Sequence, residues 1–533
     1  MLNRPLMYGA LASSLLLASC SKTETAKPYA VEEAPLSQIS ADLAAGKTTS
    51  VAVTTAYIER IKTYNGALNA VILVAPNALD QAAAADKRRK DGKALGPLDG
   101  IPVLIKDNID VAGMVTTGGS YALTENMPAK DSEVARRLRA AGVVFLGKAN
   151  TSQWAGLRTS MGFNGSTVGG SPKNPYDLTK SPAGSSSGSG IAAATSLSAA
   201  TVGTDTTGSV IAPSNVNGIV GMRPTVALIS RHGIIPVSSF QDTSGPMGRS
   251  VTDVAMMLSA MAGSDPADPA SKDSDANKAA DYTKGLSADA LKGKKLGVIR
   301  GFSGYSDTTK PVFDAAVEVL KAQGAELVDI PLDLFEDLSQ EQRTIMIYDI
   351  KQDMAAYLKD APAAVKARTL ADLIEFNKTE AHEKLHTQDL FEAAEATTGR
   401  DNPEFIKTAE YAKRRAGEDG YGKAMRDYGV SALVLLTGGP AGVIPPDEGA
   451  AGGHPASVRE KGSRPPSGSG TAALAGYPDL NVPAGFVDGM PVGISFIGMP
   501  WSEQTLLAYG FAYEQASKKR MPPEAYKKAV AAK

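Results

Sequence analysis

Apolar residues recur three and four positions apart near the start of the chain, a spacing typical of helices that bury one face. The pattern predicts helices over residues 36–90, and the positions that carry it are Leu36, Ile39, Leu43, Val53, Tyr57 and Ile61. Further along, an alanine-rich run at 191–200 and most of 309–428 are predicted to be helical. The polar stretch 264–290 is typical of a solvated connector.

Short, continuous apolar runs predict buried strands between these helices. They lie at 101–105, 143–146, 296–299 and 433–436. Strands that alternate with helices favour an α/β fold. A chain of 533 residues is long enough for one large enzyme fold or about three domains.

Charge and cysteine content exclude some classes of protein. The chain carries 55 Lys and Arg against 57 Asp and Glu, for a net charge of −2, which argues against a nucleic-acid binder with a broad basic surface. A single cysteine excludes an internal disulfide and a cysteine-cluster metal site.

That cysteine ends a segment with the features of a secretory signal. Arg4 precedes an apolar run at 11–17 that is too short to cross a membrane. Because Cys20 follows small residues, the segment resembles a bacterial lipoprotein signal, in which the cysteine becomes the lipidated N-terminus; a secretory signal that happens to contain a cysteine is the alternative. With Ser21 next, the resemblance implies a lipid anchor in the outer membrane facing the periplasm, and residues 21–33 would form a tether.

Two motifs place polar side chains beside an apolar run or within a flexible, Gly/Ser-rich segment. GPLDGIPVLIKDNID at 96–110 places Lys106 at the end of a predicted strand, where burial would disfavour its charge; a surface lysine is the alternative. SPAGSSSGSG at 181–190 has the backbone of a linker, a turn or an anion-binding loop. It also matches the G-x-S-x-G nucleophile elbow centred on Ser186, but the turn-like residues before it do not supply the strand that an elbow needs.

A third motif completes a resemblance to a known family. GTDTTGSVIAPSNVNGIVGMRPT at 203–225 presents consecutive backbone N–H groups beside a serine, a cluster that could stabilise an oxyanion. In this order, the motifs resemble those of the amidase signature family, in which DxxGS is followed by G-x-[KR]-P-T. The similarity extends to LAGYPDLNVPAGFVDGMPVGISFIGMPWSEQTLL at 474–507 and covers roughly residues 36–520. Residues 230–247 and 348–358 look most like the peptide amidase branch.

The resemblance implies a single large α/β domain with a twisted mixed β-sheet covered by helices on both faces. The chain would then divide into a lipoprotein signal at 1–20, the tether, an amidase domain at 34–525 and a tail at 526–533. Within the domain, 309–428 would be a variable helical region that shapes the substrate pocket.

By position, the family's catalytic lysine falls on Lys106, its bridging serine on Ser185 and its nucleophile on Ser209. The separation of 24 residues between the two serines agrees with the family's spacing. The resemblance also implies a cis peptide bond after Gly184. The oxyanion donors would be the backbone N–H groups of Thr206, Thr207, Gly208 and Ser209.

These residues would form a Ser-Ser-Lys triad that requires no metal or organic cofactor. A serine hydroxyl needs a base within hydrogen-bonding reach, yet the three motifs contain no histidine. A buried, neutral lysine can serve instead. Ser185 would pass the proton of Ser209 to Lys106 and return it to the leaving amine, and water would then hydrolyse the acyl-enzyme.

Two departures from the family's pattern bear on the substrate. Thr207 stands where the family often has glycine, which makes the oxyanion loop bulkier, and Ile211 stands where many members have arginine. Some members bind a substrate carboxylate through positive charge. The absence of that arginine therefore favours a neutral, hydrophobic or peptide C-terminal amide over a small acidic one.

A zinc-protease pattern competes with this interpretation. His382-Glu383-Lys384-Leu385-His386 matches H-E-x-x-H, in which two histidines bind zinc and the glutamate acts as base. Glu395, Glu404 or Glu410 could supply a third ligand in principle. The polar flanking residues favour instead a solvated charged helix with two exposed histidines. His454 lies in a Gly/Pro-rich stretch and could line the site entrance, but a plain loop is favoured.

Three functions from different classes remain. The leading one is an exported amidase that acts on a small-molecule or peptide amide, is held at the membrane through Cys20 and binds no nucleic acid. The second is a protein like the amidase-signature subunit of glutamyl-tRNA amidotransferases, which shares the motifs but works in the cytosol. The third is a non-catalytic binding lipoprotein of the same fold, which the intact Lys106, Ser185 and Ser209 disfavour. The oligomeric state is left open.

Overall fold

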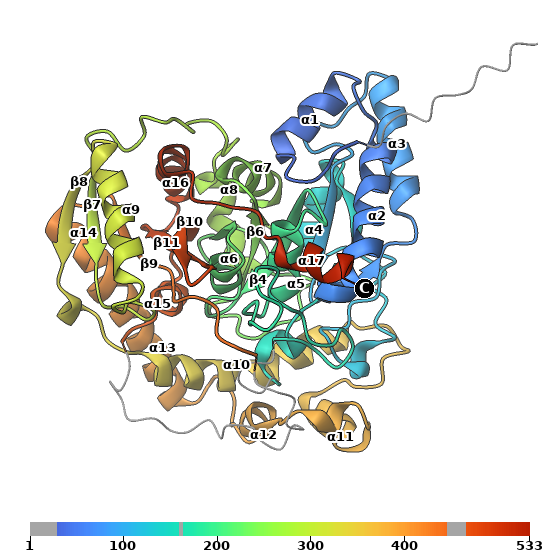
Figure 1. Cartoon of the computed structure of the whole chain (residues 1–533). Coiled ribbons are helices and arrows are strands. Elements are labelled where there is room, and N and C mark those ends of the chain that lie inside the picture. The colour runs from blue at the N-terminus through green and yellow to red at the C-terminus, as the bar shows by residue number, and fades with distance from the viewer. Residues whose placement is uncertain (1–28, 159–163, 445–464, 533) are drawn as a thin grey trace, which may run out of the picture.

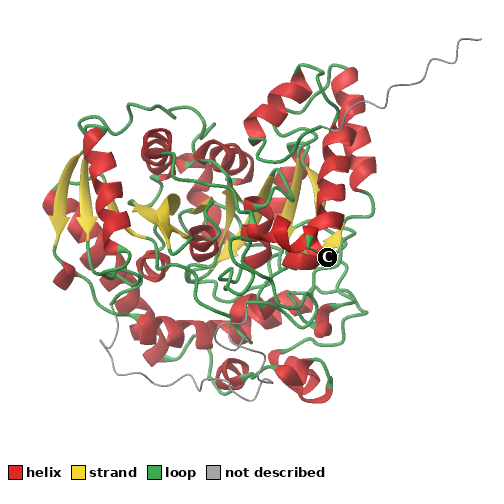
Figure 2. Cartoon of the chain, viewed as in Figure 1, coloured by secondary structure: helices red, strands yellow, loops and turns green. Residues whose placement is uncertain are grey.

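The computed structural model describes residues 29–158, 164–444 and 465–532. Over these residues, 11 strands form one sheet, and helices lie on both sides of it (Figures 1 and 2). The large single α/β domain with a mixed sheet confirms the predicted fold. Cys20 and His454 lie outside the described residues.

The sheet brings two strand ends together at one edge. Its strands, in spatial order, are β1 (Val71–Val74), β3 (Val144–Ala149), β2 (Pro102–Lys106), β4 (Ala200–Asp205), β6 (Thr243–Gly248), β5 (Val220–Arg223), β10 (Asp479–Val487), β11 (Met490–Ile497), β9 (Ala432–Leu436), β7 (Lys295–Ile299) and β8 (Glu326–Ile330). β2 pairs in parallel with β3 and β4, and β7 pairs in parallel with β8 and β9; the other neighbours are antiparallel. Because β2 and β4 are parallel neighbours, their final residues, Lys106 and Asp205, lie at the same edge.

Several helices begin at side-chain caps. The hydroxyls of Thr49, Ser132, Ser250 and Thr369 each accept a hydrogen bond from the backbone N–H three residues later, which satisfies a donor that the first helical turn leaves free. The helices are α1 (Leu36–Ala44), α2 (Ser50–Leu68), α3 (Ala78–Lys90), α4 (Glu133–Ala140), α5 (Ser187–Ala194), α6 (Ile211–Val216), α7 (Val251–Met261), α8 (Ser274–Asn277), α9 (Lys310–Ala322), α10 (Ser339–Lys359), α11 (Leu370–Thr379), α12 (Asp389–Glu395), α13 (Pro403–Ala416), α14 (Gly422–Tyr428), α15 (Gly468–Ala475), α16 (Glu503–Ser517) and α17 (Ala525–Ala531).

The four predicted strands are present as β2, β3, β7 and β9, but two local predictions were wrong. β1 interrupts the region predicted to be helical at 36–90. The region 309–428 is mostly helical as predicted, and β8 lies within it. Both strands are only four or five residues long, so their apolar runs are too short to be distinguished from helix by periodicity. The helix predicted to reach residue 200 ends at Ala194, because Ala200 already pairs with Val103 in the sheet.

Two stretches that were expected to lie outside the domain pack against it. α17 falls largely within the expected tail, and it contacts α2 and buries Tyr526 against Tyr64. At the other end, Val31 is buried and Glu33 forms an ion pair with Arg520. The last residues of the expected tether are therefore part of the packed body.

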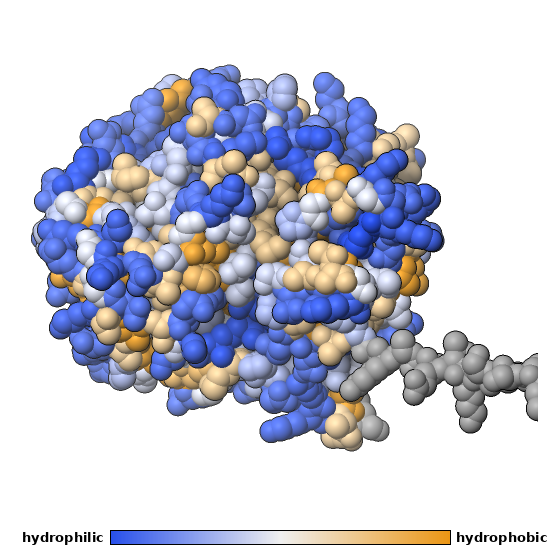
Figure 3. Space-filling model, turned by 90° about the horizontal axis from the view of Figure 1, so that it is seen from above, coloured by the Kyte–Doolittle hydropathy of each residue, from blue (hydrophilic) through white to orange (hydrophobic). Residues whose placement is uncertain are grey.

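The helical region that follows β8 shares a separate apolar core with earlier segments of the chain. Ile350, Leu373 and Phe391, from α10, α11 and α12, pack around Trp154. On the face seen in Figure 3, strongly apolar residues form small separate groups on a mostly hydrophilic surface. Among the described residues, no helix combines the length and the apolar character needed to cross a membrane.

Candidate active site

Lys106 is the last residue of β2, and its side chain is completely buried. Its Nζ lies 2.7 Å from Ser185 Oγ and 2.8 Å from Thr204 Oγ1. Burial lowers the pKa of Lys106 to about 7, although the negative charges of Asp205 and Asp242 act in the opposite direction. A substantial fraction of this amine is therefore neutral at physiological pH and can accept a proton.

Ser185 is held in place by its own backbone. The peptide bond between Gly184 and Ser185 is cis, as the resemblance implied. The Ser185 carbonyl accepts hydrogen bonds from Ser152 N at 3.0 Å and Thr151 Oγ1 at 3.1 Å. A Cβ on Gly184 would lie 2.4 Å from Ser152 Oγ, so only glycine fits before the bridging serine.

Asp205 holds the loop that carries Ser209. Its carboxylate accepts hydrogen bonds from the backbone N–H groups of Gly208 at 2.8 Å and Val210 at 2.7 Å. The same carboxylate forms an ion pair at 2.7 Å with Arg223, and both side chains are fully buried. The arginine of the G-x-[KR]-P-T turn thus fixes the nucleophile loop through Asp205.

The loop places Ser209 beside the Ser185 turn. Ser186 N donates a hydrogen bond to the Ser209 carbonyl at 3.2 Å, which joins the backbones of the two segments. Within the described residues, no hydrogen bond links the hydroxyls of Ser185 and Ser209. The structure therefore forms the Lys106–Ser185 contact and joins the backbone of Ser209 to the turn that carries Ser185.

The expected oxyanion donors are not equivalent. Gly208 N already donates to Asp205, whereas the backbone N–H groups of Thr206, Thr207 and Ser209 have no acceptor among the described residues. The Thr206 hydroxyl donates to Asp242 Oδ1 at 2.6 Å, which leaves its amide unaffected. The amides of Thr206, Thr207 and Ser209 can thus donate to an oxyanion, and Gly208 contributes to loop geometry instead.

Ser186, the centre of the elbow pattern, has a structural role. It is fully buried, and its hydroxyl donates to the Thr204 carbonyl at 3.0 Å and accepts from Thr204 N at 3.2 Å. No strand leads directly into it among the described residues. These contacts tie the turn to β4 and leave Ser186 without the exposure of an elbow nucleophile.

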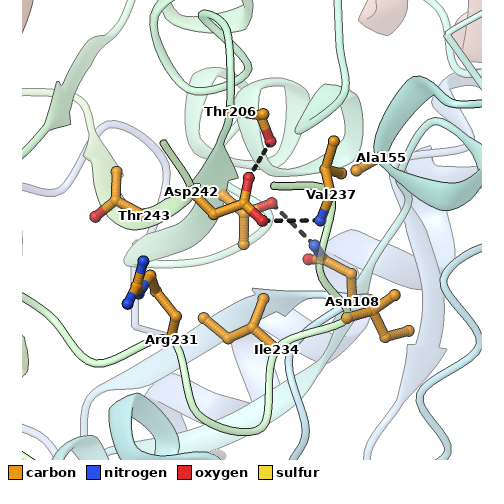
Figure 4. A pocket seen from close by; sticks show the side chains of 10 residues that line it. Asn108, Ala155, Thr206, Arg231, Ile234, Val237, Asp242 and Thr243 are labelled. Carbon is orange, nitrogen blue, oxygen red and sulfur yellow. Dashed lines mark hydrogen bonds between the residues drawn. The ribbon is translucent and has the colours of Figure 1, made fainter. Parts of the chain in front are cut away.

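A small cavity (Figure 4) is lined in part by Thr204, whose hydroxyl contacts Lys106 Nζ. Asp242, which lines it, accepts hydrogen bonds from Val237 N at 2.8 Å and Ser238 N at 2.9 Å in addition to Thr206. Burial raises the pKa of Asp242 to about 6. The lining residues are Asn108, Ala155, Thr204, Thr206, Arg231, Ile234, Ile235, Val237, Asp242 and Thr243.

Sequence reasoning missed Asn108, Arg231 and Asp242 as site residues. Arg231 and Asp242 lie in the segment 230–247, which was noted only for its resemblance to peptide amidases, and Asn108 lies in the motif of Lys106. The guanidinium of Arg231 pairs with Asp268 at 2.6 Å. Asp268 belongs to the stretch predicted to be a solvated connector, so this part of the prediction was wrong.

The H-E-x-x-H segment does not form a zinc site. Only Glu383–Leu385 is helical, as a single 3₁₀ turn, so the two histidines do not share one face of an α-helix. His382 is exposed and stacks on Tyr121. Among the described residues, no cluster of three or more His, Cys, Asp and Glu side chains could hold a metal ion.

The expectation of a solvated helix was also wrong, because Glu383 is completely buried. It forms an ion pair with Arg158 at 2.5 Å, accepts 2.7 Å hydrogen bonds from Ser120 Oγ and Tyr121 N, and binds Gln153 Nε2. A local pattern of charged residues gives no information about such distant partners. Glu383 connects the helical region to Ser120, Tyr121 and the side chain of Gln153, which follows Ser152.

We expect Glu383→Gln to destabilise the fold strongly. The substitution leaves the buried Arg158 charge without its partner, and breaking a buried ion pair in this way costs about 3–5 kcal/mol. Thermal and urea unfolding would show a lower midpoint. Glu380→Gln, which removes the partly exposed partner of the exposed His382, is the matched control and should leave the midpoint nearly unchanged. Equal shifts for the two variants would contradict this role.

Comparisons with known proteins identify the family of the chain. A family model described as Amidase matches residues 52–507. The native peptide amidase of Stenotrophomonas maltophilia is 39% identical, with a TM-score of 0.84 over 92% of this chain and 98% of that chain. A probable amidase of Arabidopsis thaliana is 34% identical over 96% of both chains. A glutamyl-tRNA(Gln) amidotransferase subunit from Chloroflexus aurantiacus is 34% identical over 89% of this chain and 95% of its own.

The match of one family model to most of the chain, together with relatives that align over nearly their whole length, shows the family. The structural similarity to peptide amidases confirms the branch predicted from residues 230–247 and 348–358. The chain therefore belongs to the amidase signature family, resembles its peptide amidases in structure, and is an amide hydrolase.

Proposed function

We propose that this enzyme hydrolyses neutral carboxamides through an acyl-enzyme, with Ser209 as nucleophile, Ser185 as proton relay and Lys106 as base. The observation that carries the proposal is the contact of 2.7 Å between Lys106 Nζ and Ser185 Oγ in a fully buried setting. A lysine amine becomes a competent base when burial removes its charge.

The proposed reaction has an acylation step followed by a deacylation step. Ser209 Oγ attacks the amide carbonyl as its proton passes through Ser185 to Lys106, and the backbone N–H groups of Thr206, Thr207 and Ser209 stabilise the oxyanion. The C–N bond breaks as the nitrogen takes the proton back from Ser185. Water then attacks the acyl carbon and gives its proton to Lys106 through Ser185. The proton returns to Ser209 Oγ as the bond between that oxygen and the acyl carbon breaks.

The charges around the cavity favour a neutral substrate. Arg231 lines the cavity with a positive charge, but its ion pair with Asp268 offsets that charge. Ile211, which occupies the position where many family members have arginine, is buried. A substrate carboxylate would also lie near Asp242. The similarity to a peptide amidase supports a peptide C-terminal amide or another hydrophobic amide as substrate.

The direct test combines a covalent label with a panel of substrates. A fluorophosphonate probe should label Ser209, identified by peptide mass spectrometry, and the purified enzyme should hydrolyse peptide amides faster than short aliphatic or acidic amides. Labelling of a different serine, or no turnover of any amide, would contradict the proposal. Turnover of acidic amides in preference to peptide amides would overturn the substrate class.

An amidotransferase-like function is the second candidate, because a glutamyl-tRNA(Gln) amidotransferase subunit matches this chain over 89% of its length. Such a chain would act on free glutamine and would need tRNA and partner chains. Hydrolysis of peptide amides by the isolated protein, without hydrolysis of free glutamine, would reject it. Glutamine hydrolysis that depends on added partner chains would support it instead.

We further propose that Cys20 carries a lipid anchor that holds the enzyme at the outer membrane, on the periplasmic side. The support is the sequence of the first twenty residues alone. Expressed in a Gram-negative host, Cys20→Ala should shift the protein from the membrane to the soluble fraction and abolish incorporation of labelled palmitate. A variant that still fractionates with membranes would contradict the anchor.

A further inference from the structure

The cavity beside Lys106 contains a buried acceptor that the protein does not satisfy. Asn108 is 1% exposed, and its Nδ2 donates to Thr204 Oγ1 at 3.0 Å. Its Oδ1 has no hydrogen-bond partner among the described residues, and Figure 4 shows Asn108 and Asp242 extending toward the same space. An unsatisfied buried acceptor costs about 1–3 kcal/mol, so its position on a cavity wall indicates a bound group that donates to it.

Thr204 supplies a donor to the same space. Its Oγ1 receives a hydrogen bond from Asn108 and lies 2.8 Å from Lys106 Nζ. When Lys106 is neutral and accepts the proton of Ser185, its own N–H groups are directed at Thr204. The hydrogen of the Thr204 hydroxyl must then point elsewhere, and Thr204 lines the cavity.

The remaining walls restrict the size and chemistry of an occupant. Asp242 adds a carboxylate, while Ile234, Ile235 and Val237 close the cavity with apolar side chains. The enclosed space suits about one molecule of the size of water. An occupant must therefore be small and able to donate a hydrogen bond to Asn108 Oδ1. It can also donate to Asp242 and accept from the Thr204 hydroxyl.

We propose that this cavity is the subsite for ammonia, the leaving group of a primary carboxamide, and for the water that replaces it. Ammonia carries three N–H donors and one lone pair, which match the Asn108 and Asp242 acceptors and the Thr204 donor. Water offers two donors and two lone pairs and fits the same set. The inference rests on the proposed amidase function and extends it by naming the group that binds beside the lysine.

The subsite accounts for both halves of the reaction. The C–N bond breaks as nitrogen takes its proton from Ser185, and NH₃ moves into the cavity. Water then takes its place and attacks the acyl carbon; its proton returns through Ser185, and Ser209 Oγ receives that proton as the C–Oγ bond breaks. Because the attacking water must approach from the side on which the amine left, one small subsite serves both molecules. A methyl group on the nitrogen would contact the apolar walls.

The test compares a peptide amide with its N-methylamide in three proteins. Wild type should favour the primary amide by about 100-fold or more in kcat/KM, and Asn108→Ala should reduce that ratio by about tenfold or more, because it removes an acceptor and makes room. Asn481→Ala is the matched control. Asn481 is also fully buried, with Oδ1 unpartnered among the described residues and Nδ2 bonded to the Ile219 carbonyl, so its substitution should leave the ratio unchanged.

Inhibition of the wild-type enzyme by small amines tests the same proposal if Asn108→Ala does not fold. Ammonium chloride should inhibit hydrolysis at lower concentration than methylammonium chloride, with potassium chloride as the ionic-strength control. Equal inhibition by the two amines, or an unchanged ratio in a folded Asn108→Ala variant, would overturn the subsite. If Ser209 is not labelled and no amide is hydrolysed, the proposed function fails instead, so the two failures are distinguishable.

Discussion

Ser209→Ala is expected to reduce amide hydrolysis by about 10⁴-fold or more, because removal of a nucleophile leaves only transition-state binding. The fold should persist, since no hydrogen bond of the Ser209 hydroxyl to another described residue would be lost. The measurement is kcat/KM on a peptide amide, with fluorophosphonate labelling and thermal unfolding on the same preparation. Labelling should disappear while the unfolding midpoint stays within a few degrees.

Ser186→Ala is the matched control for this prediction. Its hydroxyl bonds only to the backbone of Thr204 among the described residues, so the variant should lose some stability but keep Ser209 labelling and measurable turnover. A Ser209→Ala enzyme that retains substantial activity would contradict the assignment. A larger loss of hydrolytic activity in Ser186→Ala than in Ser209→Ala would also contradict it.

Lys106→Met is expected to reduce kcat/KM by about 10²–10⁴-fold, the usual contribution of a general base. Methionine keeps most of the buried aliphatic volume but cannot accept a proton, so Ser185 would have no base behind it. Because the lysine is completely buried, its removal also removes an amine that is costly to charge. We therefore expect little loss of thermal stability, measured beside kcat/KM on a peptide amide.

Lys148→Met separates this effect from the loss of any buried lysine. Lys148 is equally buried, but its Nζ donates to the Ile109 carbonyl at 2.5 Å and to Thr116 Oγ1 at 2.7 Å. That variant should be less stable yet should still label at Ser209. Similar losses of labelling rate in both variants would show that Lys106 acts through structure and not as a base.

The catalytic assignments could be predicted from sequence because each rests on a short motif next to a recognisable element. Lys106 follows an apolar run that forms β2, and Ser185 and Ser209 lie in turns marked by glycine and serine. The structure brings Lys106 and Ser185 into contact and places the Ser209 loop beside them. Their roles in catalysis stay predictions until the variants are measured.

The cavity and the buried glutamate could not be predicted in the same way. Asp242 reaches Thr206 because β6 pairs with β4, although the two residues lie 36 positions apart. Arg231 depends on Asp268, whose polar surroundings in the sequence suggest only solvent. Glu383 binds Arg158, 225 positions away. Polar residues with distant partners look the same in a sequence as polar residues on the surface.

The central claim is that a neutral Lys106 amine activates Ser209 through Ser185. The pH dependence of the rate of fluorophosphonate labelling at Ser209 tests it most directly. Because burial lowers the pKa of Lys106 to about 7, the amine loses its proton as pH rises through that value. The labelling rate of the wild type should therefore increase between about pH 6 and pH 8 and then level off, whereas Lys106→Met should label slowly and without that rise. A wild-type rate that is independent of pH or falls with rising pH, or the same rise in Lys106→Met, would contradict the claim.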